Sequence, residues 1–238
     1  MKAMIFCAGL GTRLKPLTDT MPKALVPLAG KPLLQWQVEK LRDAGITDII
    51  VNVHHFPDQI IDAVRIHNGW GCNITISDER DQLLDTGGGL KKALTHYTLH
   101  NTPILACNVD ILSNVDLRAL IAEYERTGLS QLVVSERKTQ RYLCFDEQDT
   151  LCGWTNIATG EIKGRDGRHL AFSGCQILGE DVLKRLVEIK EDKFSLIDLY
   201  LRICDKEVLK AYVPANYKMM DVGKIDQIAE AEAFAESL

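Results

Sequence analysis

The residues best suited to chemistry gather in a glycine-rich, basic segment near the start of the sequence. An almost uniformly apolar run over residues 3–8 breaks there into a loop of glycines, threonines and cations. Glycines let the backbone bend so that several amide groups point at one place, and nearby cations add positive charge. Such a loop suits a polyphosphate. Its candidate ligand-binding residues are Ala8, Gly9, Gly11, Thr12, Arg13 and Lys23.

The positive charge is local to this segment. Residues 1–40 hold six lysines and arginines against two acids, a net charge of +4, whereas the whole chain carries −5. An acidic protein of this kind is not expected to bind nucleic acid generally, but a focused basic loop can hold a small anion. The cations alternate with glycine, proline and threonine, which favours a binding site over a solvated basic face.

The loop lacks the elements of two common nucleotide-binding motifs. A Walker loop needs G-x-x-x-x-G-K-[ST], which does not occur here, and a dinucleotide fingerprint needs a glycine where Leu14 stands. The second expected strand is followed by His54 and His55 and not by a ribose-binding acid. A dinucleotide-dependent oxidoreductase is therefore disfavoured, and we expect both histidines to be structural.

Alternating strand and helix patterns would position this loop. The first half of the chain predicts strands at 3–8, 48–53, 73–77 and 103–108, and helices at 33–43, 57–67, 87–97 and 116–127. Such alternation predicts an α/β, Rossmann-like fold with a mixed, mostly parallel sheet flanked by helices. Ligands bind beyond the carboxyl ends of strands in such sheets, where the opening loop and residues 78–89 and 108–113 fall.

The pattern becomes richer in strands after about residue 130. Strands are expected at 131–136, 141–145, 150–155, 170–178 and 207–213, and helices at 180–190, 194–203 and 224–236. We interpret the added strands as a small antiparallel lobe on the same core. The chain is then one domain, residues 1–238, with halves at 1–130 and 131–238.

Cysteine spacing and hydropathy indicate which covalent or metal crosslinks and which cellular location to expect. The seven cysteines show no C-x-x-C spacing, so we expect buried free thiols and neither a disulfide framework nor a structural zinc site. No apolar run approaches the roughly 20 residues that span a bilayer, and the apolar start is too short for a signal peptide. We therefore expect a cytoplasmic protein with no membrane partner.

The opening loop resembles the signature of the sugar-1-phosphate nucleotidyltransferases. The resemblance rests on Ala8-Gly-Leu-Gly-Thr-Arg13-Leu-Lys-Pro16-Leu-Thr18 and on Pro22-Lys23-Ala-Leu-Val-Pro27. It continues through residues 86–89, 108–110, 172–174 and 221–223. It implies a GT-A-like nucleotidyltransferase fold with a nucleotide-binding half, 1–130, and a sugar-side half, 131–238. The implied partners are a nucleoside triphosphate and a sugar 1-phosphate.

The resemblance also implies roles for individual residues. Arg13 and Lys23 would be catalytic and, with Ala8 and the loop amides, would hold the triphosphate. Two carboxylates at strand ends suit Mg²⁺, which keeps several waters and takes other ligands from phosphates. The remaining implied assignments are Gly87 and Gly88 to the nucleotide base, Asp110 and Asp221 to Mg²⁺, and Asn108, Ser173 and Gly174 to the sugar.

The resemblance leaves open the nucleotide base, the sugar, the catalytic or non-catalytic class and the oligomeric state. The run Asp85–Leu90 and the short length favour members that transfer uridylyl from UTP to N-acetylmuramate 1-phosphate in cell-wall recycling. Arg141 and Lys193 are candidate partners for an acidic sugar substituent. Mannose- or heptose-1-phosphate guanylyltransferases and cytidylyltransferases are alternatives, as is a non-catalytic nucleotide-sensing subunit. We expect a monomer or a small homo-oligomer.

Overall fold

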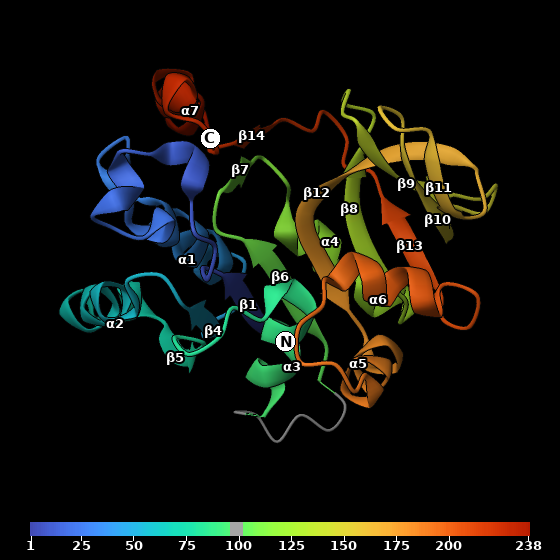
Figure 1. Ribbon diagram of the computed structural model, residues 1–238, viewed down its shortest axis with the longest axis horizontal. Helices are drawn as coiled ribbons and strands as arrows, with labels where there is room; N and C mark the ends of the chain where they lie inside the picture. Colours follow the sequence, from blue (N-terminus) through green and yellow to red (C-terminus); the bar gives the residue numbers. More distant parts are fainter. Residues whose placement is uncertain (96–101) are drawn as a thin grey trace.

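Four parallel strands form the centre of the main sheet in the computed structural model, which describes residues 1–95 and 102–238 (Figure 1). They are β1 (Lys2–Phe6), β4 (Asp48–Val53), β5 (Asn73–Asp78) and β6 (Ile104–Asn108). Strand β1 pairs with β6 on one side and with β4 on the other, and β4 pairs with β5. The apolar runs of β1, β4 and β6 are buried on both faces, as is typical of parallel strands.

Helices cover both faces of this centre. Successive strand residues point to opposite faces, so Ile5 and Ile49 join one apolar core and Met4 and Ile50 join the other. The first core is closed by α1 (Leu33–Asp43), α2 (Pro57–Ile66) and α4 (Leu117–Thr127). The second is closed by α3 (Asp85–Leu94), α5 (Glu180–Glu188) and α6 (Leu196–Ile203). This arrangement confirms the expected α/β class.

An antiparallel lobe continues the same sheet. The long strand β12 (Arg168–Leu178) pairs with β6 and extends beyond it to pair with β8 (Ser130–Ser135) and β9 (Arg141–Phe145). The lobe is completed by β10 (Leu151–Asn156), β11 (Glu161–Gly164) and β13 (Leu209–Tyr212). In Figure 1 this lobe lies on the right, opposite α1 and α2. A single sheet therefore runs from one half of the chain into the other.

Short strand pairs were not expected from the sequence. β7 (Ile111–Ser113) pairs with β14 (Met219–Asp221), and β2 (Pro27–Leu28) pairs with β3 (Lys31–Pro32). Strands of two or three residues are too short to show a period-two pattern. The pair β7–β14 brings the chain's last quarter back to its centre, after which the 3₁₀ turn Ile225–Gln227 leads into α7 (Ile228–Glu236).

The predicted helix at 87–97 begins two residues early, so its glycine run lies inside the first turns of α3. Positions 96 and 97 of that prediction lie outside the described residues. All seven cysteines are free, and six of them are buried. None of the helices among the described residues combines the length and apolarity needed to cross a membrane.

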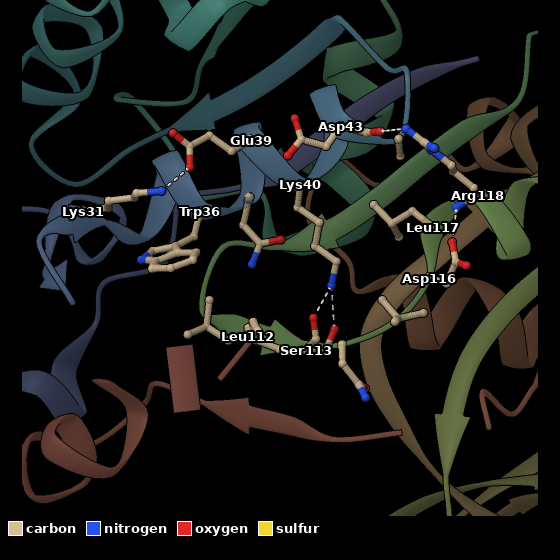
Figure 2. A pocket seen from close by; sticks show the side chains of 15 residues that line it. Lys31, Trp36, Glu39, Lys40, Asp43, Leu112, Ser113, Asp116, Leu117 and Arg118 are labelled. Atoms are coloured by element: carbon tan, nitrogen blue, oxygen red, sulfur yellow. Dashed lines mark hydrogen bonds and ion pairs between the residues drawn. The ribbon is translucent and has the colours of Figure 1, made fainter. Parts of the chain in front are cut away.

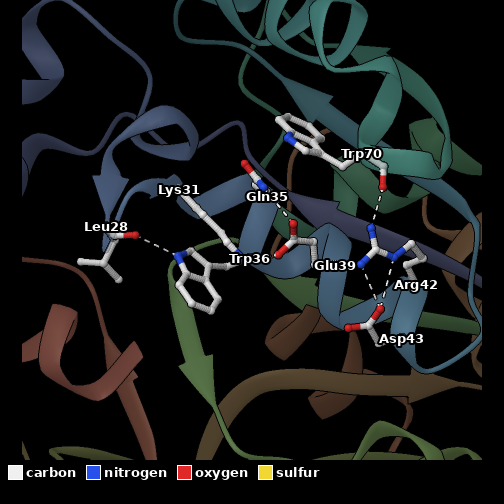
Figure 3. A network of polar contacts seen from close by, with 8 residues as sticks. All are labelled: Leu28, Lys31, Gln35, Trp36, Glu39, Arg42, Asp43 and Trp70. Carbon is white, nitrogen blue, oxygen red and sulfur yellow. Dashed lines mark hydrogen bonds and ion pairs between the residues drawn. The ribbon is translucent and has the colours of Figure 1, made fainter. Parts of the chain in front are cut away.

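Helix α1 is fixed on its outer side by a polar network (Figure 3). The Trp36 indole donates to the carbonyl of Leu28 at 3.0 Å, and Arg42 donates to the carbonyl of Trp70 at 3.0 Å. Between them, Glu39 accepts from Lys31 at 2.6 Å. Burial raises the pKa of Glu39, but hydrogen bonds and the charge of Lys31 hold it below its ordinary value. These contacts hold both ends of α1 in place.

Candidate active site

The opening loop folds back on itself at the carboxyl end of β1. The amide of Cys7 donates to Asn52 Oδ1 at 2.8 Å, which ties the start of the loop to β4. Gly11 adopts a left-handed conformation with φ of 64°, and its carbonyl accepts from Thr18 Oγ1 at 2.9 Å. A Cβ at Gly11 would lie 2.8 Å from the Thr18 methyl group and 3.1 Å from Lys23 Cβ. The glycine therefore lets the loop close around the Lys23 stem.

A cavity of about 430 Å³ lies beside this loop. It opens at the carboxyl ends of β1, β4 and β6, where an open α/β sheet is expected to bind ligands. Six of the candidate residues line it: Ala8, Gly9, Lys23, Asn108, Asp110 and Lys193. The other lining residues are Phe6, Cys7, Asn52, Leu83, Asp85, Thr86 and Val109.

The two aspartates predicted to bind metal are brought together by the β7–β14 pair. Asp221 lies opposite Ile111, the residue after Asp110, and the amide of Val222 donates to the carbonyl of Asp110 at 2.9 Å. More than a hundred residues separate the two carboxylates in the sequence. The fold places them at the same edge of the sheet.

Each aspartate faces one of the two cations assigned to catalysis. Lys23 Nζ donates to Asp110 Oδ2, and both side chains are largely buried. Arg13 Nη2 lies 3.7 Å from Asp221 Oδ2, with both side chains about half exposed. A Cβ at Gly223 would lie 2.8 Å from Asp221 Oδ1 and 2.9 Å from Arg13 Nη2. Glycine at position 223 therefore lets these two groups approach.

The aspartate pair has the donor chemistry that a hard divalent cation needs. Asp221 Oδ1 is buried and accepts no hydrogen bond from any described residue. Buried polar atoms normally have partners, so an orphaned carboxylate oxygen points to a missing ligand. Oxygen ligands of this kind fit Mg²⁺. The residues present therefore fit the expected metal.

Helix α1 holds the strand that follows Asp110 (Figure 2). Gln37 donates to the carbonyl of Ile111 at 2.7 Å, and Lys40 Nζ donates to the carbonyl and hydroxyl of Ser113 at 2.5 and 2.9 Å. Burial lowers the pKa of Lys40, which indicates that its ammonium sits in a poorly solvated place. A second cavity of about 460 Å³ lies between α1 and residues 112–118. Hydrogen bonds therefore join α1 to β7 as well as to its outer polar network.

Gly87 and Gly88, which were expected to contact the nucleotide base, contact another segment of the chain. The amides of Gly87 and Gly88 both donate to the carbonyl of Phe194, at 2.9 and 3.1 Å. A Cβ at Gly88 would lie 2.0 Å from the carbonyl oxygen of Asp192. The close approach that these glycines permit is made by the segment 192–194 of the chain itself. Their base-binding role stays a prediction, while the preceding residues Asp85 and Thr86 line the cavity.

A buried polar pair beside the cavity, Asn52 and Glu79, was not predicted from the sequence. Asn52 Nδ2 donates to Glu79 Oε1 at 2.8 Å, and the amide of Leu84 donates to Glu79 Oε2 at 3.3 Å. Burial raises the pKa of Glu79. A Cβ at Gly89 would lie 2.8 Å from Glu79 Oε1, so this glycine makes room for the carboxylate. The available signal was an asparagine in an otherwise apolar strand, DIIVNV.

The residues assigned to the sugar lie where β6 meets β12. Gly174 has φ of 67°, and a Cβ there would lie 2.9 Å from Asn108 Nδ2. Ser173 is buried, and its hydroxyl has no hydrogen-bond partner among the described residues. Asn108 lines the 430 Å³ cavity and Gly174 lies against Asn108 from β12, whereas Ser173 does not line this cavity.

A further cavity in the antiparallel lobe carries positive charge. It has a volume of about 460 Å³ and is lined by Arg137, Arg141 and Lys163, with Asp198 as the one acid among its described lining residues. No described residue forms an ion pair with the Arg141 guanidinium. Ser195 lines this cavity, and Lys193 lines the cavity beside the opening loop. The segment 193–195 therefore borders both cavities.

The sequence matches a known family over nearly its whole length. The family model described as nucleotidyl transferase matches residues 2–237. An N-acetylmuramate alpha-1-phosphate uridylyltransferase from Caulobacter vibrioides is 32% identical over 212 residues, which cover 84% of this chain and 83% of the relative. A protein of the same name from Neisseria meningitidis is 44% identical over 119 residues, about half the length of each chain.

A solved structure extends the similarity to the fold. HddC from Yersinia pseudotuberculosis, complexed with GMP-PN, superposes with a TM-score of 0.77 and 26% identity. The superposition covers 98% of this chain and 99% of HddC. The architecture described above is thus shared by a protein that binds a nucleotide.

Proposed function

The chain belongs to the nucleotidyl transferase family, and on that premise we propose that it joins UTP to N-acetylmuramate 1-phosphate and releases pyrophosphate. The observation that carries the proposal is the convergence of Arg13, Lys23, Asp110 and Asp221 at one edge of the sheet. The choice of substrates is supported by the names of the Caulobacter and Neisseria relatives. We assign the reaction to cell-wall recycling in the cytoplasm.

The chemistry is a direct displacement at phosphorus. An oxygen of the sugar phosphate forms a bond to the α-phosphorus, and the bond from the α-phosphorus to the pyrophosphate oxygen breaks. Two polyanions must meet against their mutual repulsion, so positioning and charge neutralisation are the main tasks. No covalent intermediate with the protein is involved.

The named residues divide these tasks. We assign Arg13 to hold the departing β- and γ-phosphates, and Lys23 to offset the charge that develops at the α-phosphate. The amides of Gly9, Gly11 and Thr12 complete the phosphate cradle. Asp110 and Asp221 would hold Mg²⁺, which supplies Lewis-acid stabilisation of the phosphoryl oxygens when bound.

Recognition of an acidic sugar is assigned to the lobe cavity. N-acetylmuramate carries a lactyl carboxylate that N-acetylglucosamine lacks. Arg141 offers an unpaired guanidinium, and a carboxylate–guanidinium pair is a strong, directional contact. Arg141→Ala is therefore expected to raise KM for N-acetylmuramate 1-phosphate by roughly tenfold, as for loss of about 1.4 kcal/mol, and to leave N-acetylglucosamine 1-phosphate unaffected.

The measurement is pyrophosphate release with each sugar phosphate. Arg168→Ala, which removes an exposed arginine on β12 that pairs with Asp149, is the matched control. An equal loss with both sugars would contradict the assignment of Arg141. The same assay across UTP, GTP, CTP and dTTP tests the base.

A guanylyltransferase is the second candidate, because the HddC structure is complexed with GMP-PN. Preference for GTP together with a neutral sugar 1-phosphate would favour this alternative. Nucleotide binding without turnover on any pair of substrates would instead favour a sensing subunit.

A further inference from the structure

A cluster of thiol, carboxylate and imidazole groups lies in the antiparallel lobe, apart from the residues assigned to catalysis. Cys144 Sγ, Asp166 Oδ1 and His169 Nε2 all lie within 4.8 Å of one another. His169 and Cys144 are directly opposite each other on β12 and β9. Asp166 stands on the turn between β11 and β12. From this convergence we propose that the three side chains bind a zinc ion.

The distances suit such an ion. His169 Nε2 lies 2.6 Å from Asp166 Oδ1, and Cys144 Sγ lies 3.8 Å from the same oxygen. Zinc bonds of about 2.0–2.3 Å place tetrahedral ligands roughly 3.3–3.7 Å apart, so small side-chain shifts suffice. A mixed set of sulfur, nitrogen and oxygen ligands favours zinc over magnesium or calcium. Water fills the fourth position.

The backbone holds the carboxylate over the two strands. A Cβ at Gly153 would lie 2.1 Å from the carbonyl oxygen of Arg165, so the turn before Asp166 rests directly on β10. The amide of Gly167 donates to Asp166 Oδ1 at 2.9 Å. The carboxylate is therefore presented by a fixed turn and not by a free side chain.

Protons occupy the site when no metal is bound. Burial raises the pKa of the Cys144 thiol to about 12, so this thiol is protonated at neutral pH. Zinc binds the thiolate, so zinc binding would release the thiol proton to solvent. Affinity is therefore expected to increase with pH. The His169 ring also stacks on Tyr142, at 5.7 Å between centroids, and Tyr142 lines the cationic lobe cavity.

The site was not expected from cysteine spacing. Its ligands come from two neighbouring strands and a turn, and they stand 22 and 25 positions apart from Cys144, so no short motif links them. A second thiol, Cys152, lies at a register shift in β10, with its sulfur 3.3 Å from the carbonyl oxygen of Cys144. A disulfide between these cysteines is the competing state.

Metal content and cobalt spectroscopy test the proposal on the full-length protein. After removal of metals by a chelator under reducing conditions, titration with Co²⁺ should give a thiolate-to-cobalt charge-transfer band at one equivalent, and Zn²⁺ should abolish it. His169→Ala and Cys144→Ser should lose the band or weaken cobalt affinity at least about tenfold. Cys72→Ser, at a remote half-buried thiol, should behave as the unmodified protein.

Three results would overturn the zinc site. The first is a titration of the unmodified protein without a thiolate band. The second is equal binding by His169→Ala and Cys72→Ser, with a matching thermal unfolding curve to show that the His169 variant is folded. The third is a Cys144–Cys152 disulfide that forms in air and persists in the presence of Zn²⁺. Asp110 and Asp221 alone cannot produce a thiolate band.

Discussion

Two ion pairs set the state of the site before substrate binds. Lys23 pairs with Asp110 in a largely buried place, and Arg13 pairs with Asp221 in a half-exposed one. An exposed pair of this kind contributes only about 0–1 kcal/mol, so Arg13 can exchange its partner at little cost. In the proposed reaction, the substrate phosphates would pair with the cations, and the carboxylates would then be free to bind a metal ion.

Loss of either buried partner should therefore abolish turnover. Asp110→Asn keeps the size of the side chain but removes the charge needed for Mg²⁺, and Lys23→Ala removes the cation placed beside the α-phosphate. We expect each variant to lower the rate of pyrophosphate release by roughly a hundredfold or more. Thermal unfolding should show that both remain folded.

Asp226→Asn provides the control, because it makes the same change at an exposed position five residues after Asp221. It should retain full activity. Unchanged pyrophosphate release in the Asp110 and Lys23 variants would refute their assigned roles.

At the scale of elements, the site depends on a chain of supports. The outer network fixes α1, α1 holds β7 through Gln37 and Lys40, and β7 pairs with β14. The aspartates stand next to β7 and at the end of β14. Small displacements of a positioned group can cost much activity, so these supports matter for catalysis as well as stability.

Lys40→Met tests this support. The methionine keeps an apolar stem in a partly buried position but loses both bonds to Ser113. We expect the Mg²⁺ concentration for half-maximal activity to rise roughly tenfold, the equivalent of about 1.4 kcal/mol. Stability should change little, because burial already opposes the charge on Lys40.

The measurement is a Mg²⁺ titration of pyrophosphate release at saturating substrates. Lys206→Met makes the same change at an exposed lysine and should leave the titration unchanged. An unaltered midpoint in the Lys40 variant would show that β7 is held without this contact.

The sequence predicted the elements and residues whose signals are local. Strands β4 and β9 have the predicted bounds, and the loop together with Asp110 lies at a strand end because apolar runs mark where strands stop. The position of Asp221 opposite Ile111 could not be derived, since β14 has only three residues. The contact of Gly88 with Asp192 was equally hidden, because its partner lies about a hundred positions away.

At the scale of the whole molecule, one sheet carries both the cavity beside the opening loop and the lobe proposed to bind the acidic sugar. Strand β12 pairs with β6 behind Asn108 and then continues into the lobe that carries Arg141. Beneath the opening loop, the buried Asn52–Glu79 pair links β4, β5 and α3. Burial of an ionisable group at this junction makes overall stability depend on pH.

The raised pKa of Glu79 determines whether the free energy of unfolding rises or falls with pH. Protonated Glu79 favours the folded state, so its contribution is fully present below the unfolded pKa of about 4.3 and is lost as pH rises through the folded value. Glu79→Gln removes this titration. The free energy of unfolding of the unmodified protein should therefore fall, relative to that of the variant, between pH 4.5 and pH 8.

Urea unfolding at several pH values measures this difference. Glu147→Gln, at an exposed position, should show no such divergence from the unmodified protein. A constant difference between the Glu79 variant and the unmodified protein across the range would contradict the prediction.

The β7–β14 pair also has a consequence for how the protein is made. Asp110 leaves the ribosome long before Asp221 is synthesised, and the orphaned carboxylate oxygen belongs to the later residue. The nascent chain can therefore fold its nucleotide loop and parallel strands while half of the proposed metal site is still missing. A chain still under translation would hold the proposed triphosphate-binding loop in an inactive form, and the proposed catalytic competence would arrive only after Asp221 is made.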